Sequence, residues 1–490
     1  MKKLQRLLFR LLIFILLIII GAVCLKTITY TPKQFTYAPV GKIEVSDDVV
    51  KRLAGAVRFP TVSYEDRVDT IAFRNLHAFI DKEFVLVDSF LEKSMVNEFS
   101  AVYYWPGKNQ NLKPVLLLAH LDVVPVEKES QNLWTQPPYS GKIENGIIWG
   151  RGTLDDKVSA FGMLEAIELL LQKNYQPERS IYLAFGHDEE VGGENGAIAM
   201  ARQFKQEGLD FEFVLDEGSV VLENALPGLS KPLAMIGNSE KGYTTLSLTA
   251  RLSQGGHSSM PPKETAIGVL SKALVALEEN PFPGKIDGPI KELFDHVGPE
   301  MEWPHKMIFA NLWLFEGILV NQLSATPTSN AILRTTTALT MLDAGVKENV
   351  LPSQANAKIN FRILPGETPA TVADHVRKII NDDRIEVKEE NPEFSSAPSK
   401  ISSTTSFGYN VLQRTAREIY EDVIVAPMVV IAATDSRHYN EVSDNIFRFL
   451  PIQLTNDDLK CIHGVDEKIS IDTYKKAIQY YYQLILNGSK

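Results

Sequence analysis

The chain has 490 residues, of which 44% are hydrophobic and 23% charged, a composition typical of a folded globular protein long enough for more than one domain. Its formal net charge is −11, and the sequence shows no basic patch of the kind that nucleic-acid binding needs, so that class of protein is excluded. It has only two cysteines, Cys24 and Cys461, so we expect no disulfide inside the folded body.

The N-terminus has the pattern of a membrane-targeting segment. An uncharged apolar stretch covers residues 11–25. It is preceded by four basic residues, Lys2, Lys3, Arg6 and Arg10. We interpret 1–26 as an uncleaved signal anchor, with a cleaved signal peptide as the alternative. Both interpretations put the body outside the cytoplasm by the positive-inside rule. A buried core helix is disfavoured, because no polar residue gives the stretch an outer face. The Thr-, Pro- and Tyr-rich segment 27–41 is expected to be a linker.

Strands and helices alternate over the next segment, 42–240. Buried strands are predicted over 115–119, 181–185 and 211–215, and helices over 158–172 and 197–206. This βαβ series predicts a mostly parallel sheet with helices on both faces, the first part of an α/β catalytic domain.

The pattern changes over 241–392, where strands alternate polar and apolar residues. Strands are predicted over 244–252, 331–342, 355–364 and 385–388, and helices over 266–278 and 368–380. The order β-α-β-β-α-β predicts a ferredoxin-like α+β domain that is inserted into the first; the family resemblance given below implies that it acts as a lid. The stretch 280–325 fits no pattern, and we expect an irregular extension.

The α/β pattern resumes over 393–490, the second part of the catalytic domain. Helices are predicted over 407–420 and 474–486, and strands over 428–433 and 446–450.

Acids and histidines gather where the predicted strands of the catalytic domain end. They are His120, Asp122, Asp155, Asp156, Glu189, Glu190, Asp216 and His463. Each alone has an ordinary explanation, such as a helix cap or a surface loop. Together at one sheet edge, however, so many carboxylates would repel one another strongly without a cation. Histidine and carboxylate are ligands of catalytic zinc, so we expect two zinc ions, with cobalt as a substitute.

Six motifs carry a resemblance to a known family. They are AHLDVVP, GRGTLDDK, HDEEVGG, VLDEG, GGHSS and IHGVDE. The set resembles the zinc metallopeptidase family of aminoacylases and carboxypeptidases. The resemblance is strongest to its carboxypeptidase S (Gly-Xaa carboxypeptidase) branch, which also holds secreted N-acyl-amino-acid hydrolases.

The resemblance implies a role for each matching residue. The metal ligands would be His120, Asp155 as the bridge, Glu190, Asp216 and His463. Glu189 would be the general base, and Asp122 would orient the ring of His120. His257 would stabilise the oxyanion, in several relatives from a neighbouring subunit. The substrate-binding residues would be Arg362, which grips a carboxylate, Asn349, Thr434 and Ser436.

The implied activity is hydrolysis of the amide bond next to a C-terminal free amino acid, as in a Gly-Xaa carboxypeptidase acting on small peptides. The alternative is an aminoacylase that acts on N-acyl amino acids, including fatty-acyl ones. The resemblance also admits a homodimer formed through the inserted domain. A catalytically inactive binding protein with the same fold is disfavoured, because both Glu189 and Asp155 are present.

Overall fold

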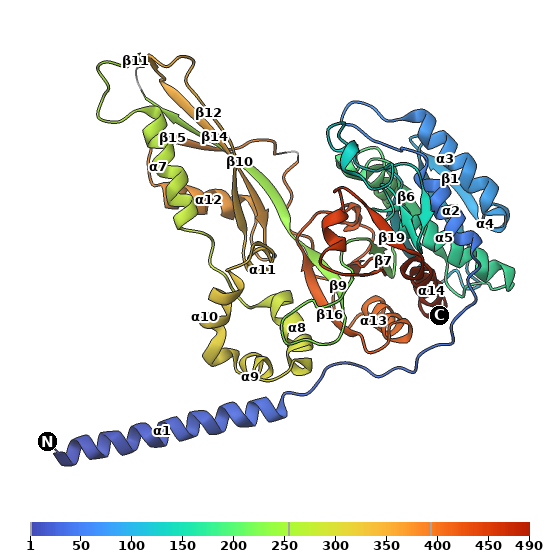
Figure 1. Ribbon diagram of the computed structural model, residues 1–490, viewed down its shortest axis with the longest axis horizontal. Coiled ribbons are helices and arrows are strands. Elements are labelled where there is room, and N and C mark those ends of the chain that lie inside the picture. The colour runs from blue at the N-terminus through green and yellow to red at the C-terminus, as the bar shows by residue number, and fades with distance from the viewer. Residues whose placement is uncertain (1, 253–254, 393) are drawn as a thin grey trace.

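The computed structural model describes residues 2–252, 255–392 and 394–490. Residues 1 and 253–254, and residue 393, which was expected to open the second part of the catalytic domain, lie outside the described residues. Figure 1 shows a large sheet surrounded by helices, a second sheet beside it and a long N-terminal helix, α1 (Lys2–Thr29), that projects away from both.

The large sheet holds ten strands among the described residues, in the order β1-β2-β6-β3-β7-β17-β9-β8-β18, with β16 also paired to β9. The strands are β1 (Glu92–Val96), β2 (Ser100–Trp105), β3 (Val115–His120), β6 (Ile181–Gly186), β7 (Phe213–Asp216), β8 (Val221–Leu222), β9 (Leu233–Glu240), β16 (Ile424–Val430), β17 (Ile446–Arg448) and β18 (Gln453–Leu454). The central strands β6, β3, β7 and β17 are parallel. Strands β1 and β2 add antiparallel pairs at one edge, and β9 pairs antiparallel with β17 and β8. The sheet is therefore mixed, where a mostly parallel one was expected.

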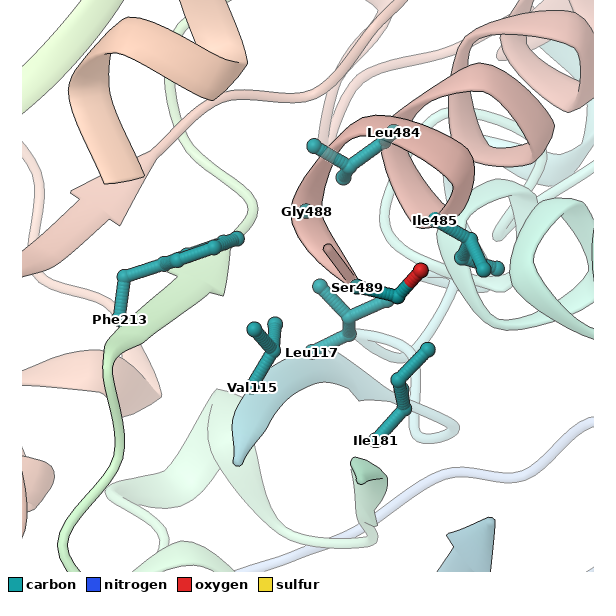
Figure 2. A pocket seen from close by; sticks show the side chains of 8 residues that line it. All are labelled: Val115, Leu117, Ile181, Phe213, Leu484, Ile485, Gly488 and Ser489. Carbon is teal, nitrogen blue, oxygen red and sulfur yellow. The ribbon is translucent and has the colours of Figure 1, made fainter. Parts of the chain in front are cut away.

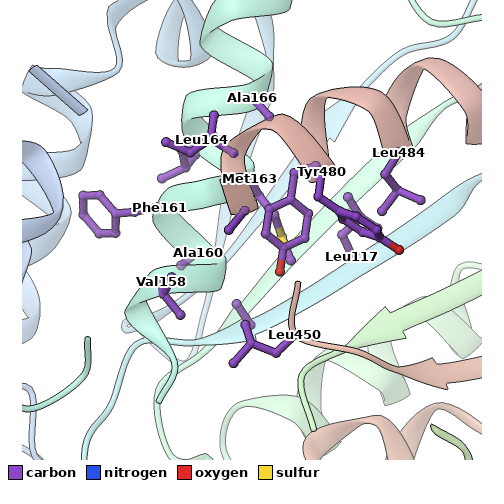
Figure 3. Packing of buried hydrophobic residues seen from close by; sticks show 14 of the residues in the cluster. Leu117, Val158, Ala160, Phe161, Met163, Leu164, Ala166, Leu450, Tyr480 and Leu484 are labelled. Carbon is purple, nitrogen blue, oxygen red and sulfur yellow. The ribbon is translucent and has the colours of Figure 1, made fainter. Parts of the chain in front are cut away.

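The central strands are buried on both faces. In β3, Val115, Leu117 and Ala119 belong to one apolar cluster, while Leu116 and Leu118 belong to another on the opposite face. On the first face, α5 (Lys157–Gln172) and α14 (Ile471–Gly488) pack together over the sheet, as Figure 3 shows. α6 (Ala197–Gln206) covers the second face.

The C-terminal helix α14 closes the start of the parallel strands. Figure 2 shows a small apolar cavity there between Val115, Ile181, Phe213 and Leu484. It has room for about one water molecule, and it lies at the opposite end of β3 from His120. It is therefore a packing gap and not a substrate site.

The second sheet has four antiparallel strands in the order β12-β14-β10-β15. Its elements are β10 (Gly242–Arg251), α7 (Ala266–Glu279), β12 (Thr336–Ala344), β14 (Gln354–Ile363), α12 (Pro369–Ile380) and β15 (Ile385–Glu389). The strands and both helices share one apolar cluster. Their order along the chain is β-α-β-β-α-β. A short ribbon of β11 (Gly256–His257) and β13 (Val350–Leu351) lies at its tip, far from the large sheet (Figure 1).

The segment expected to be irregular is largely helical. It contains α8 (Gly288–Val297), α9 (His305–Ala310), α10 (Leu312–Leu323) and, just beyond it, α11 (Pro327–Leu333). These helices share an apolar cluster with β9 and β16. Repeated prolines divide the segment into helices too short for a clear period, and Pro289 and Pro327 stand in the first turn of their helices.

Two predicted strands are displaced. The strand expected over 331–342 starts only at Thr336, because α11 occupies the residues up to Leu333. The strand expected over 428–433 is β16, Ile424–Val430, with Pro427 inside it. Among the described residues, strand β16 pairs only with β9, and an edge strand tolerates proline.

Residues 30–47, between α1 and α2 (Asp48–Val57), form no helix or strand but are held along the body. The Gln34 side chain makes two hydrogen bonds of 2.9 Å to the backbone of Val425, and the Val40 amide donates to Glu418. The remaining elements are α3 (Thr70–Glu83), α4 (Val85–Phe90), α13 (Phe407–Ile419) and a three-stranded sheet of β4 (Lys142–Glu144), β5 (Ile147–Trp149) and β19 (Lys468–Ser470).

Candidate metal centre

The candidate ligands meet at the carboxyl ends of the central parallel strands. His120 is the last residue of β3, and Asp216 is the last residue of β7. Glu189 opens a short 3₁₀ helix just after β6, and Asp155 lies just before α5. The carboxyl end of parallel strands is where open α/β sheets place their sites.

Asp155 lies between the two histidines. Its Oδ1 is 2.8 Å from His120 Nε2, and its Oδ2 is 2.9 Å from His463 Nε2. His463 reaches this position from a loop more than 300 residues later in the chain, with a left-handed backbone (φ +58°). One carboxylate that presents one oxygen to each imidazole has the arrangement that a ligand bridging two metal ions needs.

A further carboxylate faces each histidine. Glu190 Oε2 is 3.2 Å from His463 Nε2, and its buried Oε1 has no hydrogen-bond partner among the described residues. Glu217 Oε1 is 3.5 Å from His120 Nε2. In two groups, His120–Asp155–Glu190 and His120–Asp156–Glu217, the donor atoms lie within 4.8 Å of one another. A buried oxygen without a partner beside clustered acids fits a cation better than it fits a closed hydrogen-bond network.

Glu217, which the sequence analysis did not single out, takes the place beside His120 that was expected for its neighbour Asp216. The Asp216 carboxylate accepts the backbone N–H of Glu217 (3.0 Å) and of Ser436 (2.7 Å). Successive residues at a strand end point to opposite sides, so only one of two adjacent acids can face the cluster. The acid pair in VLDEG was the available signal for Glu217.

Asp122 ties the histidine to the pair of glutamates. It is fully buried, its Oδ1 lies 3.4 Å from His120 Nδ1, and its two oxygens accept the backbone N–H groups of Glu189 (3.2 Å) and Glu190 (3.1 Å). One carboxylate thus orients the imidazole and fixes the turn that carries both glutamates, an outer-shell function that tunes metal sites.

The electrostatics of the cluster reflect burial and crowding of like charges. Burial raises the pKa of Glu189 well above its usual range, and burial together with Asp155 raises the pKa of Glu217 to about 7. Hydrogen bonds to Asp155 and Glu190 raise the pKa of His463 to about 10. Carboxyls that resist ionisation beside imidazoles that hold their protons mark a site whose negative charge needs compensation.

A buried ion pair holds the loop that carries Asp155. Glu467 Oε1 accepts the N–H groups of Gly152 (2.9 Å) and Leu154 (2.8 Å), and its Oε2 is 2.6 Å from Arg151 Nη1. Arg151 also donates to the carbonyl of His463 at 3.1 Å. The pair therefore connects the loop that carries Asp155 with the loop that carries His463. The sequence analysis missed both residues, although they stand in the GRGTLDDK and IHGVDE motifs.

Two of the predicted substrate residues lie next to the cluster. Thr434 and Ser436 are buried and share a hydrogen bond of 2.7 Å, and Thr434 also donates to Glu240 (3.2 Å). Arg362, on β14, stacks over Tyr243 at 5.0 Å. Burial lowers the pKa of Arg362, and the neighbouring positive charge of Arg437 adds to the effect.

The other two predicted residues are not brought to the cluster. His257 and Asn349 are exposed at the tip of the second sheet, far from the large sheet in Figure 1. The Asn349 carbonyl accepts the N–H of Ser258, and the His257 ring accepts hydrogen bonds from Ser259. Within one chain, neither side chain takes part in the acid–histidine cluster.

Known proteins share this sequence and fold. A family described as "Peptidase family M20/M25/M40" matches residues 116–487. "Probable carboxypeptidase S-like 2" of Dictyostelium discoideum is 44% identical over 98% of this chain and 93% of its own length. "N-fatty-acyl-amino acid synthase/hydrolase PM20D1" of Xenopus tropicalis is 42% identical over 90% of this chain and 86% of its own.

Solved structures agree at the level of the fold. An M20 family metallo-carboxypeptidase, Sso-CP2 of Sulfolobus solfataricus, superposes with a TM-score of 0.62 at 19% identity over 90% of this chain and 99% of that one. YXEP of Bacillus subtilis, described as a dinuclear metal binding peptidase of the same family, gives a TM-score of 0.56 at 14% identity over 90% and 98%. With its acid–histidine cluster at the carboxyl ends of the central strands, the chain belongs to peptidase family M20/M25/M40.

Proposed function

We propose that this hydrolase uses two divalent metal ions to cleave the amide bond next to a C-terminal free amino acid. The observation that carries the proposal is the Asp155 carboxylate, which presents one oxygen to His120 and the other to His463. The relatives named as carboxypeptidases and as an N-fatty-acyl-amino acid synthase/hydrolase support the reaction class.

The donor set assigns each ion its ligands. One ion would be held by His120, Asp155 and Glu217, and the other by Asp155, Glu190 and His463. Asp216 stays the alternative to Glu217. Imidazole and carboxylate donors suit zinc, and cobalt would take the same ligands. When bound, the ions supply positive charge that lowers the pKa of water and polarises the scissile carbonyl.

The protein's own groups move the proton. Burial keeps the pKa of the Glu189 carboxyl well above its usual range. A carboxyl with a pKa near the working pH can accept a proton from the attacking water and return it to the leaving nitrogen. Asp122 holds the backbone of Glu189, so the base keeps its position during both transfers.

The free carboxylate of the substrate would be bound at the junction of the two sheets. Arg362 and Arg437 are neighbouring positive charges there, with Thr434 and Ser436 buried beside the cluster. A guanidinium suits a carboxylate because it offers two parallel donors. Recognition of a free carboxylate favours an exopeptidase or an aminoacylase over an endopeptidase.

His257 and Asn349 would complete a site only through a change in position or a second copy of the chain. Both lie at the exposed tip of the second sheet, which we propose to be the lid. A homodimer would allow the tip of one chain to reach the metal centre of another. Mixing a His257→Ala chain with a Glu189→Gln chain tests this, because only a shared site would regain activity above either variant alone.

Two substrate classes remain, and one experiment separates them. The full-length chain, loaded with zinc, would be offered Gly-Leu-type dipeptides and short- and long-chain N-acyl amino acids, with release of the free amine measured. Preference for dipeptides would support a Gly-Xaa carboxypeptidase. Preference for long acyl chains would support the activity named in the vertebrate relatives. Absence of release from any of them, with two ions bound, would contradict the proposed reaction.

Helix α1 would anchor the enzyme with its body outside the cytoplasm. It is the one helix among the described residues long and apolar enough to cross a bilayer, and it also has the composition of a signal sequence. Basic residues at its start support this orientation. The orientation can be tested with a C-terminal reporter that works only in the cytoplasm. Reporter activity would contradict the proposed orientation.

A further inference from the structure

Helix α10 and the turn before α9 expose four large apolar side chains. Trp303 is 66% exposed, Trp313 53%, Leu314 43% and Ile318 65%. Glu316 is the only charged residue in α10, and Leu319 is its only buried one. We call these four exposed side chains the α10 surface. Contiguous apolar surface on a folded domain usually marks a binding face.

The end of α1 is fixed against this surface. Asn311, fully buried just before α10, donates to the Val23 carbonyl (3.3 Å) and to Thr27 Oγ1 (3.1 Å). Lys26 Nζ lies 5.5 Å from the centre of the Trp313 ring. The last turn of α1 therefore packs directly onto the start of α10.

The chain that leaves α1 is held as well. The Tyr30 hydroxyl donates to the Phe294 carbonyl at 2.9 Å, and Lys33 pairs with Asp295 at 3.1 Å. These contacts fasten the segment after α1 onto α8. The body therefore sits in a fixed position at the end of the helix and does not hang from a loose tether.

The length of α1 sets the level of this contact in a membrane. Its 28 residues span about 42 Å at 1.5 Å per residue, which is more than the roughly 30 Å hydrocarbon layer. The last turn of α1 would then emerge at the headgroups. Tryptophan is favoured at that level, and a nearby lysine extends its charge toward water.

We propose that the α10 surface lies on the lipid bilayer that holds α1, with Trp313, Leu314 and Ile318 at the headgroup boundary. The inference rests on the proposed membrane anchor. Two observations favour lipid over a second copy of the chain: Trp313 lies against Lys26 at the end of the apolar helix α1, and α10 carries a single charged residue. Figure 1 shows α9 and α10 on the side of the body from which α1 projects.

The chain offers a clean fluorescence test. Its tryptophans are Trp105, Trp134, Trp149, Trp303 and Trp313, and none lies in α1. The full-length chain would be reconstituted into phosphatidylcholine vesicles with brominated acyl chains, which quench tryptophan on contact. Insertion of α1 alone gives no quenching, so any signal reports the body.

We expect clear quenching in the wild type and loss of at least half of it in the double variant Trp303→Phe/Trp313→Phe. The matched control Trp149→Phe, in β5, should keep it. Both replaced side chains are more than half exposed, and phenylalanine keeps a ring beside Lys26. Hydrolysis of a soluble substrate that the wild type cleaves should therefore be unchanged, and this activity reports correct folding.

Four results would overturn the inference in distinguishable ways. If the chain floats with the vesicles but shows no bromine quenching, the proposed anchor stands and the α10 contact is refuted. Quenching that survives in the double variant would place the contact elsewhere. A chain that does not float would refute anchor and contact together. Disulfide dimers of a Trp313→Cys chain that also carries Cys24→Ser and Cys461→Ser would show that a second copy covers the surface.

Discussion

Replacing Glu217 by glutamine tests whether this residue, and not Asp216, belongs to the acid cluster. Burial beside Asp155 raises the pKa of Glu217 from 4.5 to about 7. At 1.36 kcal/mol per pKa unit, ionised Glu217 lowers the stability of the metal-free protein by about 3 kcal/mol. Because the folded pKa lies above the unfolded value, this loss is absent below pH 4.5 and complete above pH 7.

The variant Glu217→Gln cannot ionise, so the metal-free protein should gain up to about 3 kcal/mol of unfolding free energy at pH 8 and almost nothing at pH 4. Denaturant titration in a chelator measures this, and elemental analysis should find one tightly bound metal ion in place of two. Asp216→Asn is the matched control. It should keep both metal ions, because its carboxylate already accepts two backbone N–H groups. Unchanged stability and two retained ions in Glu217→Gln would refute the reasoning and return the ligand role to Asp216.

Four further outcomes follow from the same geometry. Glu189→Gln should keep both metal ions and lower kcat by about 10²–10⁴-fold, and near-full activity would remove Glu189 as the base. Asp122→Asn should cost about 10–100-fold in metal affinity or activity, measured by metal titration and amine release, because one backbone N–H loses its acceptor. Arg151→Met leaves the buried Glu467 unpaired and should lower the unfolding free energy by about 3–5 kcal/mol, and a loss below 1 kcal/mol would contradict this pairing. The pKa of His463 is about 10 in the folded and 6.5 in the unfolded protein, so its contribution to stability is lost as pH rises, like that of Glu217. The melting temperature of the metal-free protein should therefore fall as pH rises from 5 to 10, and a flat profile would refute this.

The regular elements of the catalytic sheet could be predicted because their signals are local. The apolar run of β3 and the helix at 197–206 stand in the sequence within a residue or so of their positions in the structure. The edge strand β16 was expected over 428–433 but lies at Ile424–Val430. Pro427 is tolerated there because the strand is at the sheet edge, which depends on pairing and not on the local sequence. The helices of 288–333 were missed because their apolar faces are short and interrupted by proline.

The site residues also fall into those that the local sequence predicts and those that depend on distant contacts. Residues that end a strand, such as His120, follow from the strand itself. The choice between Asp216 and Glu217 depends on which way one strand end is turned, which adjacent letters do not show. The use of Glu467 to hold the Asp155 loop depends on a contact across more than 300 residues. The remote position of His257 depends on where the tip of the second sheet lies, and no local pattern encodes it.

The packing of α14 across the start of the parallel strands has a consequence for biosynthesis. Its tyrosines, Tyr480 and Tyr481, fill the core beneath α5, and His463 stands just before it. A ribosome adding 5–20 residues per second needs roughly 10–50 s to pass from the ligands near residue 217 to this helix. During that time the half-made enzyme has neither a closed core nor a complete metal centre. If the proposed centre is correct, the nascent chain is hydrolytically silent and its sheet stays uncovered until the final helix emerges.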